Sequence, residues 1–268
     1  MYEFQYHRPA SIDEASKILA SNEEAKLLAG GMTLLPTMKL RLAQPSDLVD
    51  LSGIDSLCGI KKDGATIEIG AMTPHADVAG SDVVRSEIPA LADLAGTIGD
   101  AQVRNRGTIG GSLSNSDPAA DYPAAVLGLN AVVRTNKREI MADDYFKALF
   151  ETALEPNEII QVVRFPKPKR AAYAKFPNPA SRYAVVGVMV AETADGIRVA
   201  VTGAGACAFR ASEIEAALAR DFSTTALDGM TVSADDLNED LHASSEYRAH
   251  LVIVMAKRAV AGASAPAR

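Results

Sequence analysis

Short hydrophobic runs alternate with polar residues along the first part of the chain, in patterns that predict alternating helices and strands. Ser11-Ile12-Asp13-Glu14 fits a capping box, which predicts a helix over the residues that follow. The apolar runs at 27–29 and 48–51 are typical of short buried strands. Residues 33–40 predict a helix with Thr33 as N-cap and Pro36 in its first turn, where no N–H is missed.

Period-two alternation predicts two hairpins further along. Residues 66–70 follow the turn Lys62-Asp63-Gly64 and pair with residues 58–60, and residues 131–135 pair with 138–141 across Asn136-Lys137. Helices are expected over 74–79 and 89–95, and an alanine-rich helix follows Pro123.

The composition changes at residues 165–170, where two prolines and three cations favour an exposed connection between domains. Beyond it, residues 184–191 and 197–201 predict antiparallel strands joined across Asp195-Gly196. Helices are expected over 212–218, 234–240 and 245–260, with a frayed end from Ala261. The chain therefore has an α+β pattern, divided into residues 1–170 and 171–268.

Composition and charge narrow the possible functions. The 268 residues carry a net charge of -7, and no apolar stretch approaches the roughly 20 residues that span a bilayer. An acidic chain without basic runs argues against nucleic acid as a partner. No secretory signal is visible at the N-terminus, so we expect a cytoplasmic protein without membrane insertion.

Cysteine and histidine provide no pattern for a metal site. Cys58 and Cys207 are far apart and lack a CxxC frame, so this chain cannot by itself hold an iron-sulfur cluster or a structural zinc. Two buried thiols are expected. The four histidines show no ligand spacing, and no metal site is predicted.

Two glycine pairs are the most informative features. The first glycine segment is residues 27–34 with Gly30-Gly31, and the second is residues 108–112 with Gly110-Gly111. Without a Cβ, successive backbone N–H groups can converge on an oxyanion, so the two segments are interpreted as halves of one diphosphate cradle. Thr33 and Ser112 can add hydroxyl donors.

Positive charge lies near both segments in the sequence. Arg104 and Arg106 precede the second, and Lys39 and Arg41 follow the first. The alternative is that each glycine pair is only a strand-ending turn and each cation belongs to a solvated surface. A nucleotide-binding loop of the Rossmann type is disfavoured, because Thr202-Gly203-Ala204-Gly205 lacks the third glycine and a following helix; it is better explained as a strand exit or β-bulge.

Three motifs in order, residues 29–42, 104–113 and 117–121, resemble the FAD-binding medium subunit of molybdenum hydroxylases. That family includes carbon monoxide dehydrogenase and xanthine dehydrogenase. Residues 201–211 and 247–251 resemble its C-terminal domain, so the likeness spans nearly the whole chain. It implies a two-subdomain FAD-binding domain of the vanillyl-alcohol-oxidase (PCMH) type over residues 1–170. Residues 171–268 would form a C-terminal α+β domain with an antiparallel sheet and helices.

The resemblance also implies which residues bind FAD. The two glycine segments would wrap the diphosphate, Asp121 would accept hydrogen bonds from ribose or ribityl hydroxyls, Ile160 would present backbone to the adenine, and Lys175 would lie near the isoalloxazine, where a cation stabilises the reduced flavin. The implied cofactor-binding residues are Leu27, Leu28, Ala29, Gly30, Gly31, Met32, Thr33, Leu34, Thr108, Ile109, Gly110, Gly111, Ser112, Asp121, Ile160 and Lys175. No residue is assigned a catalytic role.

The implied function is that of an oxidoreductase subunit that transfers electrons. A large subunit would hold molybdopterin, a small one iron-sulfur clusters, and FAD on this chain would pass electrons to NAD, a quinone, a cytochrome or oxygen, within a dimer of heterotrimers. A stand-alone flavin reductase of the same fold and a cofactor-free scaffold are the alternatives.

Overall fold

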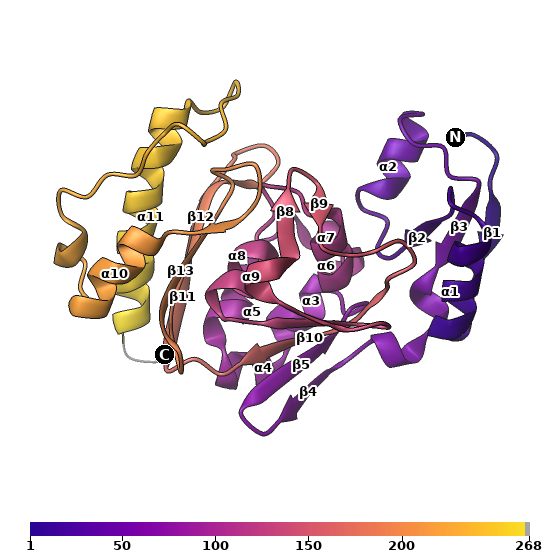
Figure 1. Cartoon of the computed structure of the whole chain (residues 1–268), viewed down its shortest axis with the longest axis horizontal. Coiled ribbons are helices and arrows are strands. Elements are labelled where there is room, and N and C mark those ends of the chain that lie inside the picture. Colours follow the sequence, from indigo (N-terminus) through magenta and orange to yellow (C-terminus); the bar gives the residue numbers. More distant parts are fainter. Residues whose placement is uncertain (266–268) are drawn as a thin grey trace.

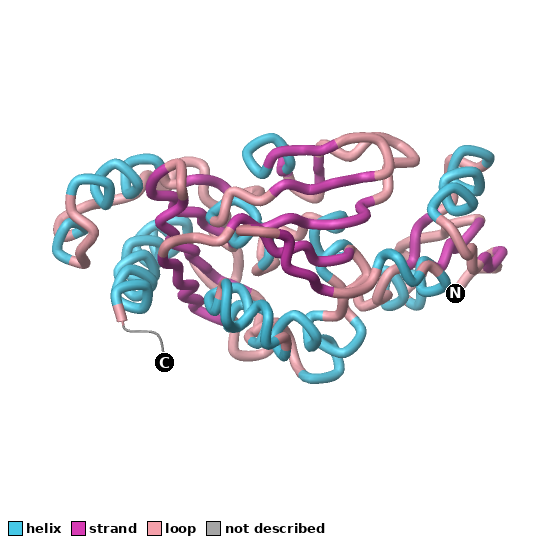
Figure 2. The backbone as a smooth tube through the Cα atoms, turned by 90° about the horizontal axis from the view of Figure 1, so that it is seen from below, coloured by secondary structure: helices cyan, strands magenta, loops and turns pink. Residues whose placement is uncertain are grey.

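The computed structural model describes residues 1–265, which form three parts that lie in a row (Figure 1). An N-terminal part lies at one end, a central part with a five-stranded sheet in the middle, and a C-terminal part with a four-stranded sheet at the other end. Figure 2 shows helices and strands in all three parts. The predicted α+β class is confirmed.

The N-terminal part is a small parallel sheet with strand order β1-β3-β2. As predicted, Ser11 caps the first helix by accepting a hydrogen bond from the Glu14 amide at 3.2 Å. Ala15 and Leu19 of that helix pack with Val49 in a separate small core. The elements are β1 (Gln5–His7), α1 (Ile12–Ser21), β2 (Lys26–Leu28), α2 (Leu34–Lys39), β3 (Asp47–Asp50) and the 3-10 turns η1 (Leu51–Gly53) and η2 (Asp55–Leu57).

The central part is an antiparallel sheet of order β4-β5-β10-β6-β7, and both predicted hairpins are present. In the first of them the expected turn is wrong, because Lys62 and Asp63 pair within the strand and the chain turns at Gly64-Ala65. Its inward residues, such as Ile69 and Phe165, share one core with Leu94 and Tyr122 of the helices. The strands are β4 (Ile60–Asp63), β5 (Thr66–Gly70), β6 (Val132–Thr135), β7 (Glu139–Met141), β8 (Phe146–Ala148), β9 (Glu151–Thr152) and β10 (Ile160–Pro166). The helices are α3 (His75–Gly80), α4 (Asp82–Glu87), α5 (Pro89–Gly96), α6 (Ala101–Arg106), α7 (Ile109–Asn115), α8 (Tyr122–Gly128) and α9 (Ala142–Tyr145).

The C-terminal part is an antiparallel sheet of order β11-β12-β13-β14, and its two helices lie together at one end of the molecule (Figure 1). Residues of α11 pack with β11 and β12, while α5 and α8 of the central part contact the same sheet. Met189 and Ala200 belong to the central core, so the two parts share buried surface. The elements are β11 (Arg170–Pro177), β12 (Ala184–Thr193), β13 (Gly196–Thr202), β14 (Phe209–Arg210), α10 (Ser212–Arg220), η3 (Thr225–Leu227) and α11 (Ser245–Ser264).

Three further local predictions are wrong. The helix expected over 234–240 is absent, because Ser233 and Asp235 bond locally and the Asn238 amide donates instead to Ala204 O at 2.7 Å. The helix expected to end near 260 continues to Ser264, since its last turns pack beside β11; residues 266–268 lie outside the described part. Cys58 is exposed rather than buried, since Leu57 occupies the core position, and Cys207 is half-buried.

Within residues 1–265, no helix is both long and apolar enough to cross a membrane.

Candidate functional site

A cavity of about 760 Å³ is lined by all three parts of the molecule. The N-terminal part contributes the first glycine segment, the central part the second glycine segment and the loop 117–121, and the C-terminal part Ser181, Arg182 and Tyr183. A cavity of this size holds a ligand larger than a single ring system. The two glycine segments, 74 or more positions apart in sequence, therefore meet at one site.

The first glycine segment is rich in unpaired amides. Gly31 has φ +72°, which turns the chain from β2 into α2. The carbonyls of Gly31 and Thr33 accept from the amides of Leu35 and Thr37, both at 3.1 Å. By contrast, none of the hydrogen bonds of residues 1–265 has an amide of residues 30–33 as donor. These four backbone donors are available to a ligand in the cavity they line.

Thr33 occupies the N-cap position of α2, but its backbone is αR and its side chain caps nothing. The predicted capping role of Thr33 is therefore wrong. Its hydroxyl remains free to meet a ligand, since Thr33 lines the cavity.

The second glycine segment has a different hydrogen-bonding state. The amides of Ile109 and Gly110 donate to Thr73 O and Ala71 O at 3.2 and 2.8 Å. Those of Gly111 and Ser112 donate to Thr108 Oγ1 and Thr108 O at 3.1 and 3.0 Å. Gly110-Gly111 is thus the first turn of α7, capped by Thr108. We expected both glycine pairs to offer free amides, and for Gly110-Gly111 this expectation is wrong.

Close packing explains why Gly30 and Gly110 must lack a side chain. A Cβ on Gly30 would lie 2.0 Å from Arg106 O, and one on Gly110 would lie 2.6 Å from Ala71 Cβ. Gly30 therefore lets the first segment touch the turn before the second, and Gly110 lets α7 lie on the residue after β5. The glycines bring the walls of the cavity together.

A buried carboxylate lies at another part of the wall. Asp121 accepts from the Tyr173 hydroxyl at 2.5 Å and from the Lys175 ammonium at 2.9 Å. Burial raises the pKa of Asp121, although the Lys175 charge and both hydrogen bonds oppose the rise. Burial next to Asp121 also raises the pKa of Tyr173 well above its usual value. The three side chains form one network in which the lysine charge is paired.

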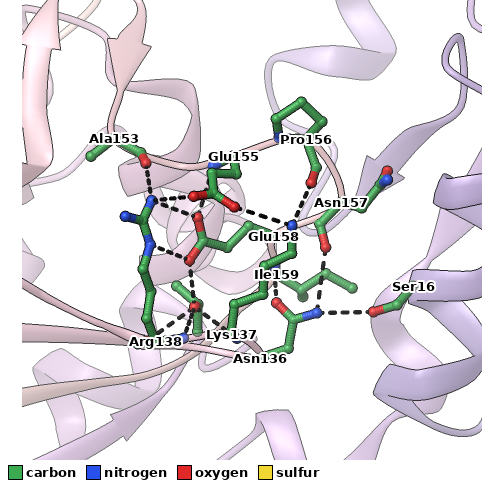
Figure 3. A network of polar contacts seen from close by, with 11 residues as sticks. Ser16, Asn136, Lys137, Arg138, Ala153, Glu155, Pro156, Asn157, Glu158 and Ile159 are labelled. Atoms are coloured by element: carbon green, nitrogen blue, oxygen red, sulfur yellow. Dashed lines mark hydrogen bonds and ion pairs between the residues drawn. The ribbon is translucent and has the colours of Figure 1, made fainter.

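A polar network holds the start of β10 beside the cavity (Figure 3). Glu158 accepts from Arg138 Nε and Nη2, both at 3.1 Å, and from Thr135 Oγ1 at 2.7 Å. Burial alone would raise the pKa of Glu158, but these bonds outweigh it and lower the pKa to about 2. The carboxylate therefore stays charged in a fixed position.

Asn136 joins the same network to the N-terminal part. Its side chain accepts from the Ile159 amide at 2.8 Å and donates to Ser16 Oγ of α1 at 3.0 Å. Through Asn136, the start of the strand that carries Ile160 is hydrogen-bonded to both the central part and the N-terminal part.

The cavity brings together most of the residues predicted from sequence. Leu28, Ile109 and Lys175 are not among its lining residues: Ile109 is fully buried, and Lys175 pairs with Asp121. The predicted residues that line it are Leu27, Ala29, Gly30, Gly31, Met32, Thr33, Leu34, Thr108, Gly110, Gly111, Ser112, Asp121 and Ile160.

The nearby cations differ from those expected. Arg104, Arg106, Lys39 and Arg41 do not line the cavity, and Arg104 instead donates to the carbonyls of Ile98 and Gly99 at 3.0 and 3.1 Å. Lys26 and Arg182 are the lysine and arginine of the described lining. Neither residue was predicted from the sequence, because neither lies in a motif that indicates ligand binding.

His75 and Asp117 also line the cavity without having been predicted. Burial, aided by the Arg104 charge, lowers the pKa of His75 to about 4, so this imidazole is neutral at pH 7. Burial raises the pKa of Asp117. Asp117 lies in the motif at 117–121 and was within reach of sequence analysis, whereas nothing in the pattern distinguishes His75.

Comparison with known proteins agrees with this geometry. Residues 2–168 match a family model described as the FAD binding domain in molybdopterin dehydrogenase. The chain is 36% identical to the carbon monoxide dehydrogenase medium chain of Hydrogenophaga pseudoflava, with 96% of each chain covered. It is 34% identical to the nicotine 6-hydroxylase medium subunit of Paenarthrobacter nicotinovorans, with 97% of each covered.

A solved structure has the same fold throughout. This is a carbon monoxide dehydrogenase from Hydrogenophaga pseudoflava that lacks the Mo-pyranopterin moiety of the molybdenum cofactor. The TM-score is 0.89 at 36% identity, and the match covers 98% of this chain and 97% of that one.

Proposed function

Because the chain belongs to the family of FAD-binding medium subunits of molybdenum hydroxylases, we propose that it carries electrons between a partner subunit and an external acceptor. The family resemblance and the PCMH-type fold inferred from sequence are confirmed, and the chain is an FAD-binding oxidoreductase subunit. Electrons would come from iron-sulfur clusters of a small subunit, after substrate oxidation at molybdopterin in a large one.

The free amides of residues 30–33 support this proposal most strongly, because they lie in a cavity whose residues suit FAD. A diphosphate needs several N–H donors at one place, and Gly31 supplies the left-handed turn that lets successive amides converge. The hydroxyls of Thr33 and Ser112 and the charge of Lys26 would add to the set. The net charge of -7 gives no general attraction, so binding depends on these local donors.

Other lining residues would orient the rest of the cofactor. Asp121 would accept from ribose or ribityl hydroxyls with the lone pairs that Tyr173 and Lys175 leave free, and Ile160 would present backbone to the adenine. Bound FAD supplies the redox chemistry by taking up and releasing two electrons. Lys175 would act on it through Asp121, as half of an ion pair, rather than as an isolated cation.

The names of the relatives support the proposal that this chain has partner subunits. These names, medium chain and medium subunit, describe components of larger complexes. We infer a large molybdopterin subunit and a small iron-sulfur subunit, assembled as a dimer of heterotrimers in the cytoplasm. Residues 1–170 would form the FAD-binding domain and residues 171–268 the C-terminal domain.

Purification of the native complex through a tag on this chain tests the proposal. We expect a yellow complex with two companion polypeptides, one carrying molybdopterin and one carrying iron-sulfur clusters. Reduction of the clusters should bleach the flavin in the complex, and removal of the small subunit should abolish that transfer. A yellow chain that elutes alone and oxidises NADPH would favour the flavin reductase, and a colourless chain that ignores added FAD would favour the scaffold.

A further inference from the structure

The loop 117–121 carries two of the cavity's carboxylates and is supported both by the central part, where the Ala124 amide of α8 donates to Asp121 O at 3.1 Å, and by the C-terminal part. It connects α7 to α8, and both Asp117 and Asp121 line the cavity. Within the loop, Asp117 Oδ1 accepts from the Ala119 amide at 2.9 Å, and the Ala120 amide donates to Asp117 O at 3.0 Å. These two bonds shape the loop itself, while its position against the cavity depends on support from outside it.

Strand ends of the C-terminal part supply that support. The Gly203 amide donates to Pro118 O at 2.7 Å, and the Ala184 amide donates to Ala119 O at 3.2 Å. The Thr202 hydroxyl lies 2.6 Å from Ala120 O and 3.0 Å from Pro118 O. Three consecutive loop carbonyls are therefore bound by the end of β13 and the start of β12.

A buried arginine holds these strand ends in turn. Arg248 Nη1 donates to Val185 O at 2.7 Å and to Gly203 O at 2.9 Å, and Nη2 pairs with Asp240 at 2.8 Å. Gly203 has φ +83°, and a Cβ there would lie 2.5 Å from Ala184 O, so the strands approach closely only with glycine at this position. The segment Thr202-Gly203-Ala204-Gly205, which lacks the third glycine of a nucleotide-binding loop, begins at the strand exit, and there Thr202 and Gly203 form a clamp on the loop 117–121.

We propose that Thr202 is a positioning residue for cofactor binding: through the carbonyls of Pro118 and Ala120 it sets where the 117–121 loop lies against the cavity. Thr202 itself is fully buried and does not line the cavity, so it acts only through the loop. Its hydroxyl is the side-chain donor of the clamp, with Arg248 behind it. This inference rests on the proposed role of the cavity in holding FAD.

Thr202→Val tests the proposal, because it keeps the shape of the side chain and removes the donor. Thr202→Ser keeps the hydroxyl. The matched control is Thr193→Val, since Thr193 is also buried in the same sheet and its hydroxyl donates to Gly196 O at 2.9 Å, in the turn at the other end of β12 and β13. For each full-length apo chain, the FAD dissociation constant, the circular dichroism of the bound flavin and the thermal unfolding midpoint are measured.

We expect Thr202→Val to raise the dissociation constant about tenfold and to change the flavin dichroism, with both restored in Thr202→Ser. Thr193→Val should leave both unchanged at a similar loss of thermal stability. A wild-type chain that binds FAD, together with a Thr202→Val chain that binds equally well or a Thr193→Val chain that is weakened equally, would overturn this inference alone. A wild-type chain that takes up no FAD would overturn the proposed function and this inference with it.

Discussion

The two glycine segments lie on the same cavity and have similar sequences, yet their backbones are used differently. In the first, the amides of residues 30–33 donate to no acceptor within the described chain, although the neighbouring carbonyls are engaged. In the second, every amide from Ile109 to Ser112 has a protein acceptor. We infer that the first segment is the anion site and that the second is the wall against which it is built.

This difference shows that a glycine can be required for two different structural reasons, a positive φ or close packing. At Gly31 the absent Cβ permits a positive φ and frees donors, whereas at Gly110 it permits helix α7 to lie against Ala71. Substitutions in the two segments should therefore fail in different ways, the first through cofactor binding and the second through folding.

The largest effect is expected from Gly110→Val. The new side chain would enter the space of Ala71, so the apo chain should lose about 3 kcal/mol of unfolding free energy. Denaturant unfolding of the apo chain measures this loss. Gly80→Val is the control, because a Cβ on Gly80 meets nothing within 4 Å, and it should change the unfolding free energy by less than about 1 kcal/mol. Equal effects of the two variants would show that the second segment has no special packing role.

His75, which packs against Gly107 just before the second glycine segment, should make the unfolding free energy depend on pH. Its Nε2 lies 2.6 Å from where a Cβ on Gly107 would be, and its pKa is lowered to about 4. Between about pH 6.5 and 4 the unfolded chain binds a proton that the folded chain excludes, so the unfolding free energy falls as the pH falls through that window. At pH 5 this group should cost about 2 kcal/mol relative to pH 7.

Unfolding of apo wild type and His75→Gln at both pH values isolates this contribution. The variant should show a smaller loss between pH 7 and pH 5. Parallel pH profiles would mean that His75 is protonated normally in the folded chain.

On the binding side, Met32→Glu should raise the FAD dissociation constant roughly tenfold or more, because a carboxylate beside the free amides repels a diphosphate and competes for its donors. Met32 is 40% exposed, so the thermal stability of the apo chain should not change. Met32→Gln matches the new side chain without its charge and should bind within about threefold of wild type. If Glu and Gln weaken binding equally, charge at this segment is unimportant.

The smallest effect is expected from Thr108→Val, which removes the cap of the Gly111 amide. Thermal unfolding of the apo chain should show that the unfolding free energy falls by about 1 kcal/mol, and Thr108→Ser should restore most of this stability. A Thr108→Val chain as stable as wild type would mean that the Gly111 amide finds another acceptor, and with it the distinction between the segments would weaken.

Much of the fold follows from local patterns. Period-two alternation predicted the hairpins, and apolar runs predicted the strands that lead to the cavity. The helix α7 was not predicted, because Gly110-Gly111 favours a turn locally, whereas in the structure Thr108 caps the helix and the Gly110 amide donates to Ala71 O. The helix expected over 234–240 gave way to tertiary contacts with Ala204 and Gly205.

The residues of the site that lie in sequence motifs could be predicted, and those brought in by tertiary packing could not. The glycine segments, Asp121 and Ile160 could be selected from motifs and the family resemblance. Lys26, His75 and Arg182 could not, since they reach the cavity only because the three parts of the molecule meet there. The pairing of Lys175 with Asp121 is likewise a tertiary contact, between residues 54 positions apart.

Amide hydrogen exchange at single-residue resolution, with and without FAD, tests the difference between the segments most directly. The amides of residues 30–33 should exchange fast in the apo chain and become strongly protected on FAD binding. Those of Gly110, Gly111 and Ser112 should be protected in both states. Protection of residues 30–33 already in the apo chain, or a gain of protection confined to Gly110–Ser112, would contradict the assignment of the first segment as the anion site.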